Sequence, residues 1–158
     1  MKILVVSDTH KKQKNLERAL EREAPIDLLI HLGDAEGYEE DIAHMAGCPL
    51  EIVAGNNDFF TRLEREKELQ LGKYRVLITH GHYYYVGSGI ADIKREAKGR
   101  GFDIVMFGHT HVPLIDYGDV IALNPGSLTY PRQEGRQPSY IRMEIDKKGK
   151  AHFQIEYL

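Results

Sequence analysis

Short polar motifs rich in aspartate, asparagine and histidine recur along this chain, and each directly follows an apolar run typical of a β-strand. The motifs are SDTH, GD, GNND, THGH and GHTH, in that order. They contain five of the eight histidines. Imidazole and carboxylate groups together suit borderline and hard divalent ions. The side chains that could do chemistry are Asp8, His10, Asp34, Asn56, Asn57, Asp58, His80, His82, His109 and His111.

Each motif taken alone has a plainer interpretation. A lone DTH is usually a turn or a helix N-cap, and a lone GD or GN is a turn signal. A lone HGH or HTH is equally well a pair of satisfied histidines at a strand end. Five consecutive strand ends that each carry Asp, Asn or His fit turns alone poorly, so we predict a metal centre. No motif contains cysteine, which excludes a structural zinc site of the cysteine type.

The candidate ligands outnumber those that one ion needs. Two ions about 3.5–4 Å apart, held together by a bridging carboxylate, form a common hydrolytic arrangement. The motifs therefore indicate a pair of divalent ions. The other histidines, His31, His44 and His152, lie outside the motifs, and we interpret them as structural or surface residues.

The elements that must position these motifs alternate between strand and helix over the first two-thirds of the chain. Strands are predicted within residues 2–8, 26–34, 49–58, 73–82 and 102–111, helices within 11–23, 37–47 and 89–101, a hairpin over 112–127, and alternating strands over 139–158. The pattern predicts an α/β domain with parallel and antiparallel pairing. If the motif-bearing strands run parallel, their carboxyl ends lie along one edge, where active sites of open α/β sheets gather.

Length and composition describe an ordinary globular protein. The 158 residues suggest a single domain over 1–158, and the net charge of −3 argues against a non-specific nucleic-acid binder. No segment approaches the roughly 18–20 consecutive apolar residues of a membrane span, and the first apolar run is too short for a signal peptide. The single cysteine, Cys48, excludes an internal disulfide and fits a reducing cytoplasm; we expect it to be a small buried residue.

The ordered motifs D-x-H, G-D, G-N-x-D, H-G-H and G-H-T-H resemble those of the calcineurin-like metallophosphoesterases. Within them, NPGS at 124–127 followed by YPR resembles the small single-domain phosphodiesterases of bacteria and archaea, the YfcE type. The motifs run from Asp8 to Arg132, nearly the whole chain. The resemblance implies a four-layer αββα sandwich of two mixed sheets, with the metal site at the carboxyl ends of the strands.

The resemblance also implies a role for each residue. It assigns one ion to Asp8, His10 and His111, the other ion to Asn56, His80 and His109, and the bridging position to Asp34. Asp58 would orient a histidine, and His82 would lie near the phosphate or just outside the ligands. In an extended segment, residues two apart point the same way, so both histidines of GHTH could face the site. Gly108 would let the backbone turn tightly just before them.

Asn57 departs from the pattern of many relatives, which carry a histidine at the third position of G-N-x-D. That histidine is thought to contact phosphate and to protonate the leaving group. An asparagine can donate a hydrogen bond to a phosphate oxygen but cannot act as an acid. We predict Asn57 and His82 as the catalytic residues beside the metal ligands, and the identity of any general acid stays open.

The function that the resemblance implies is a metal-dependent phosphoesterase, a phosphodiesterase that hydrolyses small phosphodiesters with a hydroxide activated by two metal ions. Mn²⁺ is expected to support the best activity in vitro, with Fe, Zn, Ni and Co as alternatives. The expected partner is a small phosphate ester, with no membrane and no nucleic acid, and a homo-oligomer stays open. The tyrosines at 83–85 could stack on a base or aryl group or simply form rim and core.

Two rival functions were weighed. One is an interaction scaffold, as in the retromer subunit of eukaryotes, which resembles this fold but has incomplete metal motifs. All seven proposed ligands are present here, which favours an enzyme. The other is a phosphomonoesterase or a nuclease with the same metal chemistry. A nuclease would need a basic groove, whereas the lysines of this chain are scattered.

Overall fold

Two five-stranded sheets form the centre of the computed structural model, which describes residues 1–158. The first sheet has the order β10-β9-β1-β2-β3, and the second has the order β4-β5-β6-β8-β7. The strands are β1 (Lys2–Val6), β2 (Leu28–His31), β3 (Leu50–Ile52), β4 (Glu66–Leu71), β5 (Tyr74–Thr79), β6 (Ile104–Met106), β7 (Pro113–Asp116), β8 (Ile121–Pro125), β9 (Ser139–Ile145) and β10 (Ala151–Tyr157). The helices are α1 (Lys14–Glu23), α2 (Glu39–Ala46) and α3 (Ala91–Gly99), with 3-10 turns at His82–Tyr84 and Val86–Ser88.

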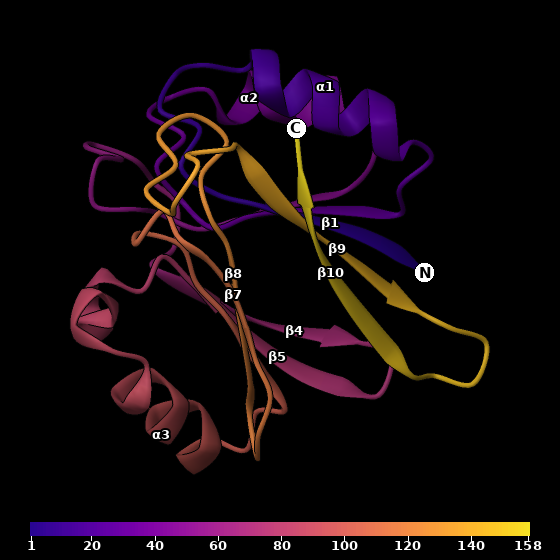
Figure 1. Cartoon of the computed structure of the whole chain (residues 1–158), viewed down its shortest axis with the longest axis vertical. Coiled ribbons are helices and arrows are strands. Elements are labelled where there is room, and N and C mark those ends of the chain that lie inside the picture. The colour runs from indigo at the N-terminus through magenta and orange to yellow at the C-terminus, as the bar shows by residue number, and fades with distance from the viewer.

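The side chains of β1 show how the layers form. Ile3 and Val5 belong to the core between the two sheets, whereas Leu4 and Val6 pack beneath α1 and α2 on the outer face. A strand covered on both faces reads as a continuous apolar run, because successive side chains point to opposite sides. Figure 1 shows the helices lying outside the pair of sheets. The predicted four-layer αββα sandwich of two mixed sheets is confirmed.

Helix α1 covers the first sheet with a narrow apolar face. Leu16, Ala19, Leu20 and Glu23 are its buried residues, at the spacing that the sequence predicted. The carboxylate of Glu23 pairs with Lys2 Nζ at 2.9 Å and accepts a hydrogen bond from the Tyr140 hydroxyl at 2.9 Å. The helix is therefore bound to β1 by a partly buried ion pair and to β9 by a hydrogen bond, as well as by apolar packing.

Helix α3 covers the outer face of the second sheet, where Ile93 and Ala97 pack in the apolar cluster that contains Leu77 and Val105. The predicted hairpin at 112–127 is confirmed as β7 and β8, which pair antiparallel. Strand β4 was not predicted from the sequence. It pairs only with β5, at the edge of the sheet.

The motif-bearing strands divide between the two sheets. Strands β1, β2 and β3 run parallel in the first sheet, and β5 and β6 run parallel in the second. Their carboxyl ends lie at the same end of the sandwich, so the site forms where two sheet edges meet rather than along one edge. None of the helices has the length and apolar character that crossing a bilayer requires.

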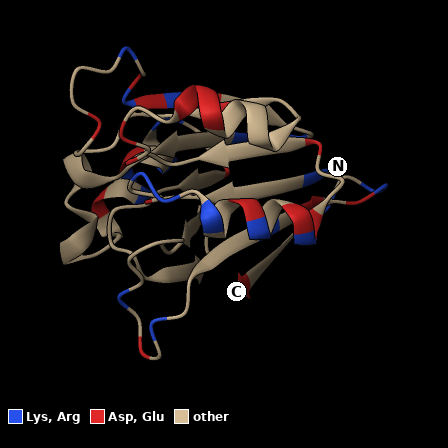
Figure 2. Ribbon diagram, turned by 90° about the horizontal axis from the view of Figure 1, so that it is seen from above, with Lys and Arg blue, Asp and Glu red and all other residues tan.

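Charged residues are interspersed on the outside of this fold. Figure 2 shows Lys and Arg mixed with Asp and Glu along most of the ribbon, whereas the first turn of α2 is acidic, with Glu39, Glu40 and Asp41. This distribution agrees with the scattered lysines of the sequence.

Candidate metal centre

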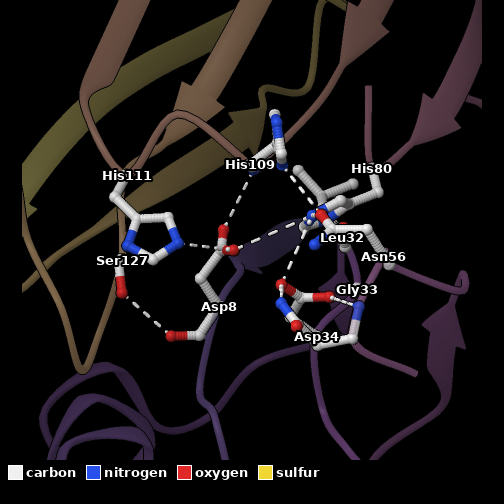
Figure 3. A network of polar contacts seen from close by, with 12 residues as sticks. Asp8, Leu32, Gly33, Asp34, Asn56, His80, His109, His111 and Ser127 are labelled. Atoms are coloured by element: carbon white, nitrogen blue, oxygen red, sulfur yellow. Dashed lines mark hydrogen bonds and ion pairs between the residues drawn. The ribbon is translucent and has the colours of Figure 1, made fainter. Parts of the chain in front are cut away.

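Three of the predicted ligands converge on one side of the site. The Oδ1 atom of Asp8 lies 3.0 Å from Nε2 of His111 and 3.7 Å from Nε2 of His10. The two histidine nitrogens are themselves 3.4 Å apart. Asp8 comes from the end of β1 and His111 from the loop after β6, so the two sheets both contribute to this group (Figure 3). Three donor atoms this close are able to bind one cation.

A second group forms around Asn56, in the loop after β3. Its Oδ1 atom lies 3.0 Å from Nε2 of His80 and 2.8 Å from Nδ1 of His109. Figure 3 shows these side chains grouped on the opposite side of Asp8 from His111. An amide oxygen and two imidazole nitrogens form a plausible ligand set for a borderline divalent ion.

Asp34, in the loop after β2, lies between the two groups. Its Oδ2 atom is 3.7 Å from Nε2 of His10 and 3.5 Å from Nε2 of His80. Asp8 is also close to the second group, because its Oδ1 lies 3.9 Å from Nε2 of His80. The structure thus brings all seven predicted ligands together, and either carboxylate is close to both groups.

Hydrogen bonds at Nδ1 orient three of the imidazoles. Nδ1 of His10 lies 2.8 Å from the Glu36 carboxylate, Nδ1 of His80 lies 2.7 Å from the Leu32 carbonyl, and Nδ1 of His111 lies 2.7 Å from the Tyr130 carbonyl. An oxygen acceptor requires Nδ1 to carry the proton, which leaves the Nε2 lone pair for the centre. Metal-binding histidines are commonly held in this way.

The buried pair formed by Asp8 and His111 provides a test of whether these residues fit a cation. Burial acts to raise the pKa of Asp8, yet the hydrogen bond from His111 and the charge of His80 lower it to about 2. Burial acts to lower the pKa of His111, but Asp8 raises it above its usual value. Because His111 Nδ1 already donates to Tyr130, a neutral His111 would direct a lone pair at the carboxylate. A proton or a metal cation is needed between them, so the residues fit a metal.

His82 and His109 have pKa values below the usual range. Burial, followed by the nearby His80 and His109, lowers the pKa of His82 to about 4. Burial and His80 likewise lower the pKa of His109. Nδ1 of His82 is buried without a hydrogen-bond partner, and its ring lies 5.4 Å from that of His80. Neutral imidazoles are the form that binds metal ions.

The backbone of the ligand loops is strained. Left-handed φ angles occur at Asp8 (56°), His10 (44°), Asp34 (60°), His109 (68°) and His111 (59°). Non-glycine residues in this region are uncommon and tend to cluster at functional sites. The prediction that GHTH is extended was therefore wrong. Strand β6 ends at Met106, and both rings face the site because their backbones turn.

Glycines allow these loops to approach one another. A Cβ at Gly108 would overlap Oγ of Ser7 and lie 2.9 Å from Oδ2 of Asp8, and a Cβ at Gly55 would overlap the Asp34 carboxylate. Gly108 has no left-handed φ. Glycine is required here for the close approach to Ser7 and Asp8, and the chain also turns tightly, because the Thr110 N–H donates to the Gly108 carbonyl at 2.8 Å.

Asp58 supports the backbone and not a histidine, which corrects the role expected from the resemblance. Its carboxylate accepts hydrogen bonds from the backbone N–H of Asp34 at 2.7 Å, Glu36 at 2.5 Å and Gly55 at 2.7 Å. These bonds join the loop after β2 to the loop after β3. They hold Asp34 and Asn56 at a fixed separation.

Asn57, predicted as catalytic, lies against Asp34. Its backbone N–H donates to Oδ1 of Asp34 at 2.8 Å, and its side-chain amide donates to Oδ2 at 2.7 Å. His82, the other predicted catalytic residue, lies beside Asn56 on the wall of an adjoining cleft. Both residues are thus next to the ligands, with Asn57 bound to the carboxylate between the two groups.

Two residues that support the site were missed in the sequence. His31 is fully buried at the end of β2, where burial lowers its pKa to about 4. Its Nδ1 accepts a hydrogen bond from the Gly33 N–H at 3.2 Å, and its Nε2 contacts the Thr9 hydroxyl at 3.1 Å. Glu36, which holds His10, follows Asp34 by two residues, and this spacing could have indicated it. His31 directly precedes LGD, which is a weaker signal.

A family model for the calcineurin-like phosphoesterase superfamily domain matches residues 1–148. The chain is 32% identical to the probable metallophosphoesterase YsnB of Bacillus subtilis, with 92% of this chain and 85% of the relative covered. It is 27% identical to the phosphodiesterase YfcE of Escherichia coli K12, with 92% of this chain and 89% of that protein covered.

Solved structures show the same similarity. A predicted phosphoesterase from Streptococcus pneumoniae superposes with a TM-score of 0.82 at 29% identity, covering 99% of this chain and 88% of that one. Vps29 from Entamoeba histolytica in complex with Zn²⁺ superposes with a TM-score of 0.78 at 21% identity, covering 99% of each chain. At 21% identity, the similarity to Vps29 shows a shared fold and nothing about function.

Proposed function

The chain belongs to the calcineurin-like phosphoesterase superfamily, and from that premise we propose that it hydrolyses small phosphodiesters at a centre of two divalent ions. Family membership makes it a metal-dependent hydrolase of phosphate esters. The phosphodiesterase YfcE, a relative over nearly the whole chain, supports the choice of a diester. The observation that carries the two-ion proposal is the arrangement of the donors in two groups of three, with Asp34 between them.

The proposed ligand sets follow the two groups. Asp8, His10 and His111 would hold one ion, Asn56, His80 and His109 would hold the other, and Asp34 would contact both. When bound, divalent ions would neutralise phosphoryl charge and lower the pKa of a water to about 7. The Nδ1 contacts with Glu36, Leu32 and Tyr130 keep the histidine lone pairs directed at the centre.

Asn57 is proposed as a positioning residue. Its backbone N–H donates to Oδ1 of Asp34 and its side-chain amide donates to Oδ2, which fixes the carboxylate between the ligand sets. An amide has no acidic proton to give to a leaving alkoxide, so Asn57 does not serve as a general acid. His82 lies close enough to Asn56 and His80 to contact a phosphate oxygen bound there.

The nature of the donors bears on the metal. The set contains imidazole, carboxylate and amide oxygen but no sulfur, which is compatible with Mn²⁺, Fe²⁺ or Zn²⁺. We propose that Mn²⁺ gives the highest activity in vitro. Ni²⁺ and Co²⁺ remain alternatives with the same donor preference.

Small substrates are favoured over polymers by the charge pattern. A nuclease binds a polyanion, and basic side chains would then line the approach to the site. Lys and Arg are instead mixed with Asp and Glu along the ribbon of Figure 2, and Arg65 is the one Lys or Arg that lines the cleft beside the site. Cys48 is the only cysteine and is a free thiol, which supports the proposal of a cytoplasmic protein.

Metal content and hydrolysis of bis(4-nitrophenyl) phosphate test this function together. Because Asp34 contacts both groups, Asp34→Asn should lower the occupancy of both ions, whereas His111→Ala should chiefly empty one. The measurement is metal stoichiometry by elemental analysis after reloading with Mn²⁺, beside the rate of hydrolysis. Asp119→Asn, on the exposed turn that pairs with Lys98, is the matched control and should retain both ions and full activity.

Three outcomes would contradict the proposal. Strong hydrolysis in excess chelator would remove the metals from the reaction. Full occupancy of both ions in Asp34→Asn would remove this residue from the bridging position. A fully loaded protein that hydrolyses neither diesters nor monoesters would favour an interaction scaffold instead of an enzyme.

A further inference from the structure

A cleft of about 510 Å³ adjoins the metal centre on the side of Asn56. Asn56 and His82 line both the cleft and the centre, so a phosphate at the metals would extend its substituent directly into the cleft. The remaining lining residues come from two segments, the loop after β3 and the 3-10 turn after β5. They are Ala54, Gly55, Asp58, Phe59, Phe60, Thr61, Leu63, Arg65 and Tyr83.

One wall carries two adjacent phenylalanines that face solvent. Phe59 is 73% exposed and Phe60 is fully exposed. Phe60 also has a left-handed φ of 59°, which is costly for a bulky residue. Single exposed apolar residues need no explanation, but an adjacent exposed pair held in a strained loop beside a catalytic centre indicates a ligand contact. The packing of the protein itself gives these rings no partner.

Tyr83, from the 3-10 turn after β5, adds a third aromatic ring to the lining of the cleft. Tyr83 is 54% exposed, and its ring lies 4.0 Å from that of His82, centroid to centroid. The guanidinium of Arg65 lies 4.7 Å from the centre of the Tyr83 ring. Arg65 forms no ion pair, so its charge is available to a ligand, and cation–π contact fixes the tyrosine beside it.

We propose that this cleft binds a planar aromatic substituent of the phosphodiester, with Phe59 and Phe60 stacking on the ring. The inference rests on the proposed function, because it places the phosphate of the substrate at the metal centre. Nucleobases and simple aryl groups both offer a π-face, so either kind of ring can stack on the two phenylalanines. An alkyl substituent would gain no stacking, and the substrate class is therefore the esters that carry an aromatic or heteroaromatic ring.

Pairs of ligands that differ in the aromatic ring test this assignment by their binding affinities. Phenylphosphonate and ethylphosphonate form the aryl pair, and uridine 5′-monophosphate and ribose 5-phosphate form the nucleobase pair. Titration calorimetry on the metal-loaded protein should show the ring-bearing member of at least one pair binding about 5- to 150-fold more tightly, as expected for base–aromatic stacking. The pair with the larger ratio of affinities shows whether the cleft prefers an aryl group or a nucleobase.

The double variant Phe59→Ala/Phe60→Ala should abolish the preference. Its affinity for ethylphosphonate should stay within about two-fold of wild type, because only the stacking partner is removed. Tyr117→Ala is the matched control, since Tyr117 is an exposed aromatic in the β7–β8 turn, at the opposite end of the second sheet. This variant should keep the full ring preference.

Several results would overturn the assignment. Equal affinities within both pairs for the wild type would show that the cleft takes no ring. A preference that survives the double variant would place the ring elsewhere. Hydrolysis of bis(4-nitrophenyl) phosphate by the wild type is measured in parallel. If it fails while ring-dependent binding persists, the proposed function falls and the cleft assignment stands.

Discussion

At the scale of single residues, the metal centre depends on groups that do not face it. Glu36 and the carbonyls of Leu32 and Tyr130 fix three imidazole tautomers, and Asp58 joins the two loops that carry Asp34 and Asn56. A displacement of these supports would move the ligands without removing any donor atom. The presence of the donor atoms and the hydrogen bonds that hold them in place are therefore separate properties of the site.

Asp58→Asn tests the supporting network. The carboxylate accepts three backbone N–H groups, and an amide would place an NH₂ group against at least one of them. Leaving that donor unsatisfied should cost about 1–3 kcal/mol of stability. Loss of a supporting contact typically weakens metal binding by about 10–100-fold. Thermal unfolding and Mn²⁺ titration measure the two effects.

Asp146→Asn is the control for Asp58→Asn. Asp146 also accepts backbone hydrogen bonds, from Lys148 and Lys150, but it lies in the exposed turn between β9 and β10. Its substitution should leave metal affinity unchanged. Unaltered Mn²⁺ affinity in Asp58→Asn would mean that the loops are held by other contacts.

The candidate ligands, and the fact that they lie together, were predictable at this scale because their residue types and their position after strands are visible in the sequence. The supports were not, because a backbone carbonyl or a buried carboxylate carries no distinctive pattern. Asp58 illustrates the limit: its place in GNND marked it as part of the site, but only the fold shows that it binds N–H groups of two loops. The sequence raised stacking on the tyrosines at 83–85, but it did not indicate that Tyr83 shares a cleft with Phe59 and Phe60, because these residues come from separate segments.

At the scale of elements, the predicted strands and helices agree with the structure wherever a continuous apolar run or a helical period marks them. Strand β1 and helix α1 are clear cases, each buried on the faces that the sequence indicates. Strand β4 has the sequence EKELQL and lies at a sheet edge. Charged side chains on an edge strand prevent its unpaired N–H and C=O groups from pairing with another chain. They also interrupt the alternation of apolar residues that would identify a strand in the sequence. That is why it was missed.

The attachment of α1 to the first sheet should make stability depend on pH. Burial acts to raise the pKa of Glu23, but hydrogen bonds from Lys2 and Tyr140 outweigh burial and hold the pKa below its usual value of 4.5. A carboxyl with a lowered folded pKa stabilises the fold above its unfolded pKa. This contribution is lost as the pH falls through the folded value.

Glu23→Gln should therefore destabilise the protein more at pH 7 than at pH 3. The expected loss at pH 7 is about 1–3 kcal/mol, because the charge-assisted bond to Lys2 disappears while a bond to Tyr140 can remain. Urea unfolding at a series of pH values gives the difference between variant and wild type. A difference that stays constant from pH 7 to pH 3 would show that the ionised carboxylate contributes nothing.

At the scale of the whole molecule, the centre joins the two sheets. Asp8, Asp34 and Asn56 follow strands of the first sheet, whereas His80, His109 and His111 follow strands of the second. The core between the sheets is apolar, with Ile3, Val5, Ile78 and Met106 among its buried residues. Ions bound at the carboxyl ends would thus add a polar connection between layers that otherwise meet through apolar contacts.

Metal binding should consequently stabilise the entire fold. An unfolded chain does not hold the seven proposed ligands together, so metal at 100 times its Kd should add about 2.7 kcal/mol for each bound ion, or about 5.4 kcal/mol for two. For a chain of this length, about 2–4 °C accompanies each kcal/mol, so Tm should rise by about 10–20 °C. Scanning calorimetry of chelator-treated protein before and after addition of Mn²⁺ measures the shift.

Two variants serve as comparisons for this shift in Tm. The Tm of Asp34→Asn should rise far less on addition of Mn²⁺, because the substitution weakens the binding of both ions, whereas the Tm of Asp119→Asn should rise as that of the wild type does. A wild-type Tm that does not move, although elemental analysis shows two bound ions, would mean that the ions bind without strengthening the connection between the sheets.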